Sequence, residues 1–511
     1  MTAPGGAPLG ISGDRFRRAA EELGLGLSSA EARDLARVAH GFEVAMESLD
    51  EAIAVSSKAP TGRQTQPVGD DPFNAIVRRV TVRDDTVTKG PLQGLRVAVK
   101  DCFAVAGVEM TAGSSILQGF VPRSDSEAVR RLIGAGATIN AITNMDCLAM
   151  SASGDSSYYG PTLCPADPAR LAGGSSSGSA AGLFYDDIDA ALGTDTGGSS
   201  RVPASWCGTL GMKPTRGLVS YRGVLGIDQL HDHVGVLARD VRVMARVLET
   251  LAGPDLLDPR QRTVPPALAL TEAAAGRSGL MGLRFGVVEE MVGPAEPAVG
   301  EAFAAGLEAL RDLGAEIVAI SIPEHRSAGP IGASMTPEGF SALLESGAQG
   351  YQWAGEYWPE LAAAVHEGFR TRADELSPHV KTQLTVGRIV RAEQPGQRYA
   401  RAANRSRDVT VAFEAALREV DFLIGPTVPT LPYLVDPGIP LDERVSRSWA
   451  TLANTSSANV TGLPALSMPV AVADGLPVGL MVTAQRFGEE DLVAVAATVQ
   501  AQIGWNRVDA H

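Results

Sequence analysis

Two glycine- and serine-rich turns separated by a more apolar segment constrain this chain more than any other feature. The stretch from Gly173 to Arg201 reads GGSSSGSAAGLFYDDIDAALGTDTGGSSR, and apolar side chains recur between its two turns. A flexible linker stays polar along its length, so the apolar middle argues against a linker. Small residues at both turns let backbone N–H groups approach a ligand or a reacting atom closely.

Two functional interpretations remain for this stretch. A phosphate cradle shows G-x-x-x-x-G-K-[ST] or G-x-G-x-x-G between a strand and a helix, and neither motif is present here. Acyl-transfer chemistry needs a nucleophile, a base and donors aimed at the developing oxyanion. Consecutive glycines followed by serine supply the nucleophile and the donors, so the base must come from another part of the chain.

Three separated motifs make the chain resemble the amidase signature family, whose members hydrolyse amides with a Ser-Ser-Lys triad. The motifs are Gly173–Ser176, Gly193–Ser199 and the upstream run Val97–Asp101, at the separations typical of the family. The likeness covers most of the chain from about Gly94 to the end. The N-terminal helices and the region Val108–Ser114 are most similar to bacterial amidases of nitrile and xenobiotic amide breakdown.

The resemblance implies an α/β fold, with a large mixed β-sheet sandwiched between helices and a helical N-terminal extension. The residues agree, because the β-rich run Leu95–Lys100 is followed by a helix-like stretch and a further strand-like stretch. We predict an N-terminal helical segment over residues 1–60, a connecting segment over 61–93 and a catalytic domain over 94–511. Residues 323–397 are interpreted either as ordinary core or as a helical subdomain that covers the substrate.

A capping box, Ser28-x-x-Glu31, predicts the start of a long helix that reaches Ile53. Apolar residues recur on it every three or four positions and form one stripe. The stripe consists of Leu35, Val38, Phe42, Met46, Leu49 and Ile53. It packs either on the core of this chain or against a second copy, and the similar extension of some bacterial amidases favours a homodimer.

The resemblance assigns the chemistry to three residues: Ser199 is the nucleophile, Ser175 relays its proton, and Lys100 is the base. A lysine acts as a base near neutral pH only when its pKa is lowered, and burial lowers it. The apolar residues before Lys100 are consistent with burial. The backbone N–H groups of Thr196, Gly197, Gly198 and Ser199 form the expected oxyanion hole. Family members hold the first serine through a cis peptide bond, which here joins Gly174 and Ser175.

Further site residues are carried over by position. Ser176, Asp195 and Arg201 are expected to support the two turns, and Met150, Thr196, Tyr158 and Tyr159 to line the substrate pocket. The chain departs from the family pattern at Ser177, Ser200 and Val236, where glycine, an apolar β-branched residue and proline are usual.

His231 and His233 invite a metal interpretation, but no other ligands cluster near them in the sequence, so we expect no metal. The other histidines are scattered and offer no local support for a Ser-His-Asp triad. The chemistry implied by the resemblance needs no cofactor.

Composition excludes several classes of partner. The formal net charge is −15 and no basic tract is present, so nucleic acid is not expected to bind. Four scattered cysteines indicate a reducing compartment, and the chain shows neither a secretory leader nor an apolar run long enough for a membrane span. The expected protein is a cytoplasmic homodimer that acts on a small-molecule amide, without nucleic acid or membrane.

The predicted function is hydrolysis of a carboxylic amide to a carboxylate and ammonia or an amine through a seryl acyl-enzyme. Within the family, the alternative is the glutaminase subunit of a tRNA-dependent amidotransferase. That subunit carries an acidic residue for the ammonium of its substrate shortly before its N-x-x-G-L-P motif, whereas residues 450–464 contain no acid and include Leu452. Ester, hydrazide, carbamate and urea-like substrates also stay open. A non-catalytic anion-binding protein is the alternative from another class.

Overall fold

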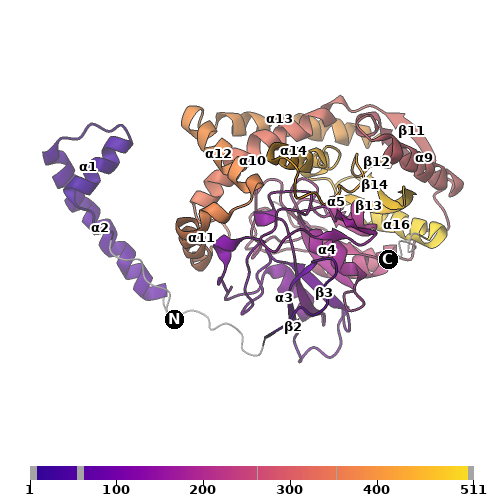
Figure 1. The fold of residues 1–511 in the computed structure, drawn as a ribbon, viewed down its shortest axis with the longest axis horizontal. Helices are drawn as coiled ribbons and strands as arrows, with labels where there is room; N and C mark the ends of the chain where they lie inside the picture. The colour runs from indigo at the N-terminus through magenta and orange to yellow at the C-terminus, as the bar shows by residue number, and fades with distance from the viewer. Residues whose placement is uncertain (1–8, 54–62, 262, 353, 505–511) are drawn as a thin grey trace. The chain divides into compact units, whose positions relative to one another are not determined.

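The computed structural model describes residues 9–53, 63–261, 263–352 and 354–504. Contacts between residues divide the chain into two compact units, residues 1–59 and residues 60–511 (Figure 1). The two units are described separately. No helix among the described residues is both long enough and apolar enough to cross a lipid bilayer.

The first unit is a pair of helices, α1 (Gly13–Glu22) and α2 (Ser29–Ile53). The predicted capping box forms at the start of α2, where Ser28 N donates to Glu31 Oε2 at 2.9 Å and Glu31 N donates to Ser28 Oγ at 3.2 Å. The two helices pack on each other, and the small side chains of Ala32, Ala36 and Ala39 on α2 are buried. Small residues therefore form the packed face of this helix.

The predicted apolar stripe of α2 lies on a different face. Its described members Leu35, Val38, Phe42 and Met46 are exposed, with between 42% and 64% of their surface accessible. The side chains of Leu49 and Ile53 lie outside the described part of the structure. Within the first unit, the stripe is therefore an apolar face that α1 does not cover.

The second unit is built on a mixed sheet of twelve strands, which confirms the predicted α/β fold. Across the sheet the strands are β1 (Gln64–Gln66), β2 (Ile76–Val82), β4 (Thr138–Thr143), β3 (Arg96–Lys100), β7 (Ala190–Asp195), β9 (His233–Ala238), β8 (Leu210–Lys213), β13 (Ala465–Ala473), β14 (Leu476–Thr483), β12 (Phe422–Pro426), β10 (Arg284–Val288) and β11 (Glu316–Ile320). Strand β3 runs parallel to both β4 and β7, whereas β7, β9, β8 and β13 are antiparallel neighbours. A separate hairpin joins β5 (Leu163–Cys164) and β6 (Asp167–Leu171).

The segment predicted to connect the two units over the surface instead adds strands to the sheet. β2 pairs antiparallel with β4, and β1 pairs antiparallel with β2 at the edge. Ile76, Val80 and Val82 on β2 are buried. Prolines and glycines before β2 resemble a loop in the sequence, but the partner of β2 is a strand about sixty residues later.

Helices cover both faces of this sheet, as predicted. They are α3 (Glu127–Gly134), α4 (Ser177–Ala181), α5 (Arg201–Cys207), α6 (Val241–Leu251), α7 (Leu270–Ala273), α8 (Glu289–Val292), α9 (Pro297–Asp312), α14 (Leu441–Ala450), α15 (Ser456–Thr461) and α16 (Glu489–Ile503). Side chains of a strand alternate between faces. On β3, Val97 belongs to the same apolar cluster as Met244 of α6, whereas its neighbour Ala98 packs in the cluster that contains Ala180 of α4.

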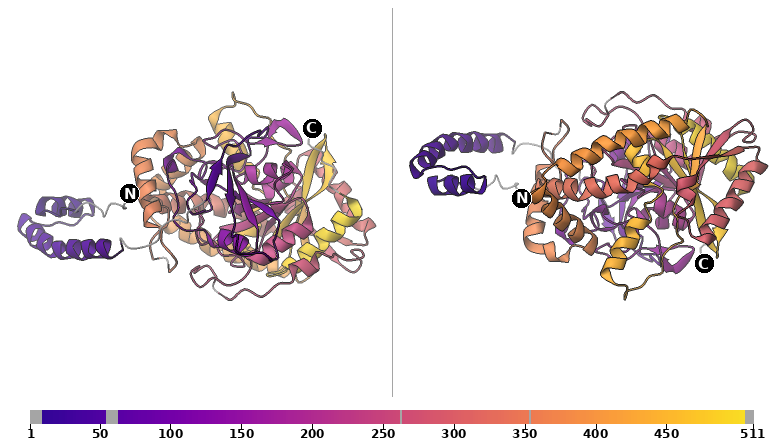
Figure 2. Two further views of the ribbon diagram at one scale, coloured as in Figure 1. Left: turned by 90° about the horizontal axis from the view of Figure 1, so that it is seen from below. Right: turned by 90° about the horizontal axis from the view of Figure 1, so that it is seen from above.

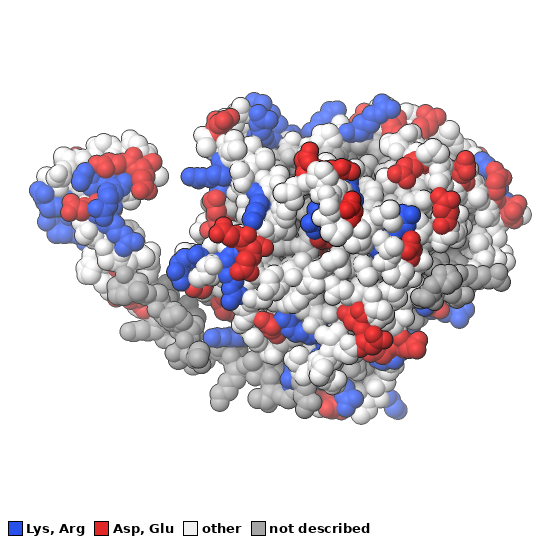
Figure 3. Space-filling view, viewed as in Figure 1, with Lys and Arg blue, Asp and Glu red and all other residues white. Residues whose placement is uncertain are grey.

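Four further helices form the helical part of the unit: α10 (Ala328–Glu345), α11 (Pro359–Arg372), α12 (Pro378–Glu393) and α13 (Gln397–Ala416). Helix α10 packs against both α12 and α13, and the three lie side by side (Figure 2). Acidic and basic side chains are interspersed on the face drawn in Figure 3. The net negative charge of the chain is therefore not gathered into one region of that face.

Candidate active site

Lys100, the last residue of β3, lies at the centre of the site and is fully buried. Its Nζ donates hydrogen bonds to Ser175 Oγ at 2.8 Å and to Thr194 Oγ1 at 2.7 Å. Burial lowers the pKa of Lys100 to about 8, although nearby acidic groups oppose the shift. A substantial fraction of the amine is therefore neutral near physiological pH, and only the neutral amine accepts a proton.

The first glycine- and serine-rich turn presents Ser175 to this lysine. The peptide bond between Gly174 and Ser175 is cis, as the resemblance implies. A Cβ atom on Gly174 would lie 1.9 Å from Asp146 Oδ2, so only glycine fits there. Ser176 N donates to the carbonyl of Ser199 at 3.1 Å, which joins the first turn to the second.

The second turn follows β7 and carries Ser199. Gly198 has φ +147°, and a Cβ atom there would lie 2.1 Å from Thr455 Oγ1. In the part of the chain that the structure describes, the backbone N–H groups of residues 196–199 donate no hydrogen bond. Four adjacent unused donors are the arrangement that binds a developing oxyanion.

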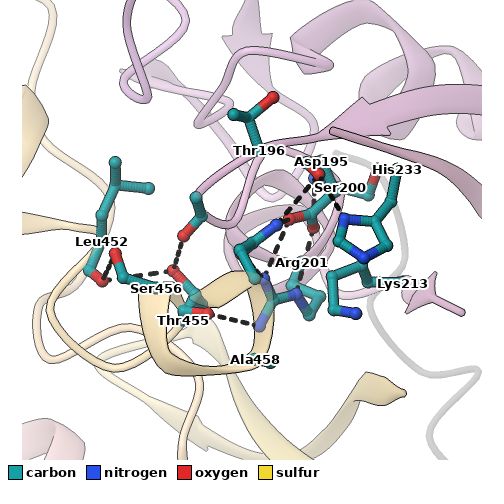
Figure 4. A network of polar contacts seen from close by, with 12 residues as sticks. Asp195, Thr196, Ser200, Arg201, Lys213, His233, Leu452, Thr455, Ser456 and Ala458 are labelled. Atoms are coloured by element: carbon teal, nitrogen blue, oxygen red, sulfur yellow. Dashed lines mark hydrogen bonds and ion pairs between the residues drawn. The ribbon is translucent and has the colours of Figure 1, made fainter. Parts of the chain in front are cut away.

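A buried ion pair holds the second turn in place (Figure 4). Arg201 contacts both carboxylate oxygens of Asp195, at 3.0 and 2.9 Å, and also donates to Thr455 O and Asn459 Oδ1 at 2.9 and 2.6 Å. Burial alone would raise the pKa of Asp195, but Arg201 and Asn459 hold it below its usual range. Asp195 therefore carries a charge inside the protein, and Arg201 neutralises it.

Asn459 of α15 and Thr455, the N-cap residue of that helix, complete this network. The sequence interpretation assigned neither of them a role. Thr455 Oγ1 donates to Gly197 O at 2.6 Å, and Asn459 Nδ2 donates to both the carbonyl and the carboxylate of Asp195 at 2.9 Å. A signal for Asn459 was present, because it begins the N-x-x-G-L-P motif. Thr455 lies outside every motif, so the sequence offered no signal for it.

Lys213 and His233 lie beside this network (Figure 4). Burial lowers the pKa of both groups well below their usual values. His233 Nδ1 faces the carbonyl of His231 at 2.6 Å, and Lys213 Nζ donates to Pro214 O at 2.9 Å. Among the described residues, Arg201 is the cation in direct contact with the Asp195 carboxylate.

A cavity of about 930 Å³ opens onto Ser199. Its lining is mostly apolar and includes Met150, Ile227, Val386, Trp449, Leu452 and Val460. Leu452 lies against the second turn, because a Cβ atom on Gly197 would be 3.2 Å from its Cδ1. Polar side chains enter the same cavity from Thr196, His231, Lys381, Asp442 and Asn459.

The predicted pocket residues occupy two different places. Met150 and Thr196 line the cavity beside Ser199. Tyr158 borders a smaller cavity of about 210 Å³, and Tyr159 Oη accepts a hydrogen bond from Arg78 at 3.2 Å. Tyr158 and Tyr159 are in edge-to-face contact with each other.

Helices α10 and α12 contribute to the cavity through Ala328, Gly332, Thr336 and Lys381. Among the aromatic residues of the segment 323–397, Tyr351 and Tyr357 are exposed, and Trp353 lies outside the described residues. The part of the cavity wall formed by α10 and α12 therefore consists of small, aliphatic and polar residues.

The three departures from the family pattern fit their surroundings. Thr162 Oγ1 donates to Ser177 Oγ at 3.0 Å, Ser200 Oγ donates to Thr194 O at 3.2 Å, and Val236 is buried in β9. Among the described residues, His231 and His233 belong to no group of three or more side chains able to hold a metal ion.

Comparisons with known proteins identify one family. The family model described as Amidase matches residues 75–493. A relative from Halobacterium salinarum, named as a subunit of glutamyl-tRNA(Gln) amidotransferase, is 36% identical over 434 residues, which cover 84% of this chain and 99% of the relative. A relative of the same name from Chloroflexus aurantiacus is 34% identical over 482 residues, which cover 92% of this chain and 96% of the relative.

Solved structures resemble the fold of this chain. The crystal structure of a glutamyl-tRNA(Gln) amidotransferase subunit from Thermotoga maritima matches with a TM-score of 0.70 and 28% identity, over 86% of this chain and 89% of that chain. The native peptide amidase from Stenotrophomonas maltophilia matches with a TM-score of 0.68 and 27% identity, over 85% of this chain and 90% of that chain.

These relatives contradict the predicted partners. The sequence interpretation expected a small-molecule amide, no nucleic acid and a homodimer. The relatives from Halobacterium salinarum and Chloroflexus aurantiacus are instead named as one subunit of an amidotransferase that is itself named for glutamyl-tRNA(Gln). The inference failed because net charge describes the whole chain and does not exclude membership of an assembly named for a nucleic acid.

Proposed function

Because this chain belongs to the amidase family and is an amidase-type enzyme, we propose that it hydrolyses a carboxylic amide through an acyl-enzyme on Ser199. The observation that carries this proposal is the buried hydrogen bond from Lys100 Nζ to Ser175 Oγ, beside a cavity that reaches Ser199. A lowered lysine pKa beside a serine is the arrangement that activates a hydroxyl nucleophile. The catalytic domain is assigned to residues 60–511, which include β1 and β2 of the sheet, with α10 and α12 covering the substrate.

The first half of the reaction forms the acyl-enzyme. Neutral Lys100 accepts the proton of Ser175, and Ser175 accepts the proton of Ser199 as its Oγ attacks the amide carbon. The oxyanion is stabilised by the N–H groups of residues 196–199. When the C–N bond breaks, the proton returns through Ser175 to the leaving nitrogen, which departs as ammonia or an amine.

The second half reverses the proton path. A water molecule attacks the ester carbon of the acyl-enzyme and gives one proton to Ser175 and Lys100. The ester C–O bond then breaks, and Ser199 recovers that proton through Ser175. The product leaves as the carboxylic acid and gives its remaining proton to solvent, which makes it a carboxylate. Asp195 and Arg201 do not touch the reacting atoms in this scheme. They position the oxyanion-binding turn.

The comparisons favour one biological setting for this chemistry. The relatives that cover most of the chain are named as one subunit of glutamyl-tRNA(Gln) amidotransferase. We therefore propose that the chain is the amide-hydrolysing subunit of such an enzyme and releases ammonia from glutamine for use on glutamyl-tRNA(Gln). Free, buried cysteines support a reducing, cytoplasmic setting.

The cavity supports a second candidate substrate class, an amide with an apolar acyl group. Met150, Trp449 and Leu452 place aliphatic and aromatic surface next to Ser199. A mostly apolar lining favours an apolar substrate because burial of apolar surface stabilises the complex. Both candidates use the same acyl-enzyme, so substrate preference separates them.

The test begins with covalent labelling, followed by product analysis. Phenylmethylsulfonyl fluoride reacts when Ser Oγ attacks sulfur and fluoride leaves, which adds one sulfonyl group that intact-protein mass detects. We expect one adduct on the wild type, none on Ser199→Ala and slow labelling of Lys100→Ala. Thr209→Ala, which removes a buried hydroxyl between α5 and β8, is the matched control and labels at the wild-type rate.

Ammonia release is then measured with glutamine and with aliphatic and aromatic amides, each with and without glutamyl-tRNA(Gln). Preference for glutamine supports the amidotransferase setting, and preference for apolar amides supports the second candidate. A wild type that takes no label from several serine-directed probes and releases no ammonia contradicts both.

A further inference from the structure

His231 lies beside the oxyanion-binding turn, although its place in the sequence suggests no role in the reaction. Strands β7 and β9 are antiparallel and pair Asp195 with His233. His231 lies in the turn that precedes β9. In the next residue, Asp232 Oδ1 accepts from Thr196 Oγ1 at 2.6 Å, which joins this turn to the oxyanion-binding turn. His231 lines the same cavity as Ser199.

The position of His231 is fixed by its backbone. His231 N donates to the carbonyl of Asp228 at 3.0 Å. Its own carbonyl accepts from His233 Nδ1 at 2.6 Å and from Asn459 Nδ2 at 3.4 Å. The side chain is 6% exposed, so the imidazole has little freedom to move away from the cavity wall.

A buried carboxylate orients the imidazole. Asp228 Oδ2 lies 3.7 Å from His231 Nδ1 and has no hydrogen bond within the part of the chain that the structure describes. Asp228 Oδ1 accepts from Leu230 N at 2.8 Å. Burial alone would raise the pKa of Asp228, but His231 and this N–H hold it below its usual range.

An ionised carboxylate beside Nδ1 favours the tautomer that carries its proton on Nδ1. In that tautomer Nε2 is the ring nitrogen that accepts hydrogen bonds. Among the described residues, the contact of the imidazole with a charged group is the one from Nδ1 to Asp228 Oδ2. The pair therefore presents one ring nitrogen to the cavity, with a buried carboxylate behind it.

We propose that His231 is a specificity-determining residue, whose Nε2 accepts a hydrogen bond from an N–H or ammonium group of the amide substrate while Asp228 supplies the negative charge. This inference rests on the proposed function, because it concerns substrate bound next to Ser199. The amidotransferase subunit binds the substrate ammonium with an acidic residue, and residues 450–464 contain no acid. The His231–Asp228 pair would take over that role. A site built to hydrogen-bond a substrate group discriminates strongly against analogues without that group.

Another carboxylate in the cavity offers a competing explanation. Asp442 on α14 lines the same cavity but is exposed to solvent, where water screens its charge. Asp228 is buried, so its charge acts in a lower dielectric and has more effect on a bound ammonium. Variants at both positions separate the two explanations.

The experiment uses two probes that differ only in an amine. 4-(2-Aminoethyl)benzenesulfonyl fluoride carries an ammonium group, and 4-ethylbenzenesulfonyl fluoride does not, while both carry the same reactive sulfonyl fluoride. The readout is the ratio of their second-order rate constants for labelling Ser199, measured by intact-protein mass. A ratio cancels changes in serine reactivity that affect both probes equally.

We expect the wild type to react at least about tenfold faster with the ammonium probe, which matches a charged hydrogen bond of moderate strength. The ratio falls towards one in His231→Phe and in Asp228→Asn. Asp228→Asn keeps the oxygen that accepts from Leu230 N, so it tests the idea even if His231→Phe fails to fold. Glu443→Gln, an exposed neighbour outside the cavity lining, keeps the wild-type ratio.

Three results overturn the inference: a wild-type ratio near one, an unchanged ratio in both variants, or a ratio that falls in Asp442→Asn and not in Asp228→Asn. Failure of the proposed function looks different. In that case neither probe labels wild-type Ser199 at all, and the inference falls with the function on which it rests.

Discussion

In the proposed mechanism, deprotonation of Lys100 sets the pH at which Ser199 becomes reactive. The amine is fully buried, and desolvation lowers its pKa from 10.5 to about 8. At pH 7 about a tenth of a group with that pKa is neutral, compared with about 0.03% of an ordinary lysine. Burial therefore raises the fraction of active base by a few hundredfold, which corresponds to about 3 kcal/mol.

The sign of the pH dependence follows from which form is active. Protonated Lys100 cannot accept a proton, so the labelling rate of Ser199 rises about tenfold per pH unit below pH 8 and levels off above it. Asp101, Asp146 and Asp232 each have a pKa raised to about 6 by burial. Their titration affects the profile near pH 6, two units below the step assigned to Lys100.

The assay measures the second-order rate constant for sulfonyl fluoride labelling from pH 5.5 to pH 10, corrected for probe hydrolysis. Lys100→Met removes the step near pH 8 and leaves only slow labelling. Lys89→Met, an exposed lysine away from the site, keeps the wild-type profile. A flat profile between pH 6 and pH 9, or the same step in Lys100→Met, refutes the assignment of Lys100 as the base.

Two substitutions test the second turn. Arg201→Met leaves the buried Asp195 charge unpaired, so we expect it to lower the free energy of unfolding by about 3–5 kcal/mol in urea titrations followed by tryptophan fluorescence. The double variant Asp195→Asn with Arg201→Met lowers the free energy of unfolding by less than the sum of the two single variants. Strict additivity of the two effects would argue against a coupled pair. Arg311→Met breaks an exposed ion pair with Glu308 and serves as the control, at a cost of less than about 1 kcal/mol. Gly198→Ala places a Cβ atom 2.1 Å from Thr455 Oγ1 at a φ of +147°, which displaces the oxyanion donors. We expect Ser199 labelling to slow by about a hundredfold or more. Gly300→Ala, where a Cβ atom meets nothing within 4 Å, labels normally; equal rates for the two alanine variants would show that the turn does not need glycine.

Local sequence determined much of the framework. The capping box at Ser28 and Glu31 set the start of α2, and the β-branched run before Lys100 became β3. The motifs also identified the family, because glycine and serine at fixed positions reflect backbone conformations that other residues do not adopt. These features depend on a few neighbouring residues, so the sequence alone reveals them.

The pairing of strands that lie far apart in the chain was harder to predict from the sequence. The partner of β2 is β4, and no local pattern in a segment rich in proline and glycine announces that pairing. The sequence identified the apolar stripe of α2, but it did not reveal which face of α2 is covered by α1. Alanines and not the larger apolar residues form that contact.

The sequence by itself determined the family, the mixed α/β architecture and the residues proposed for the triad. Only the tertiary structure decided what surrounds them. Arg201 meets Asn459 across 258 positions of the chain, and the cavity combines β-strand turns with side chains from α10, α12, α14 and α15. Nor does the spacing of Asp228 and His231 reveal that their side chains meet beside Ser199. Such contacts arise when distant segments pack together, and packing depends on the whole chain and not on local preference.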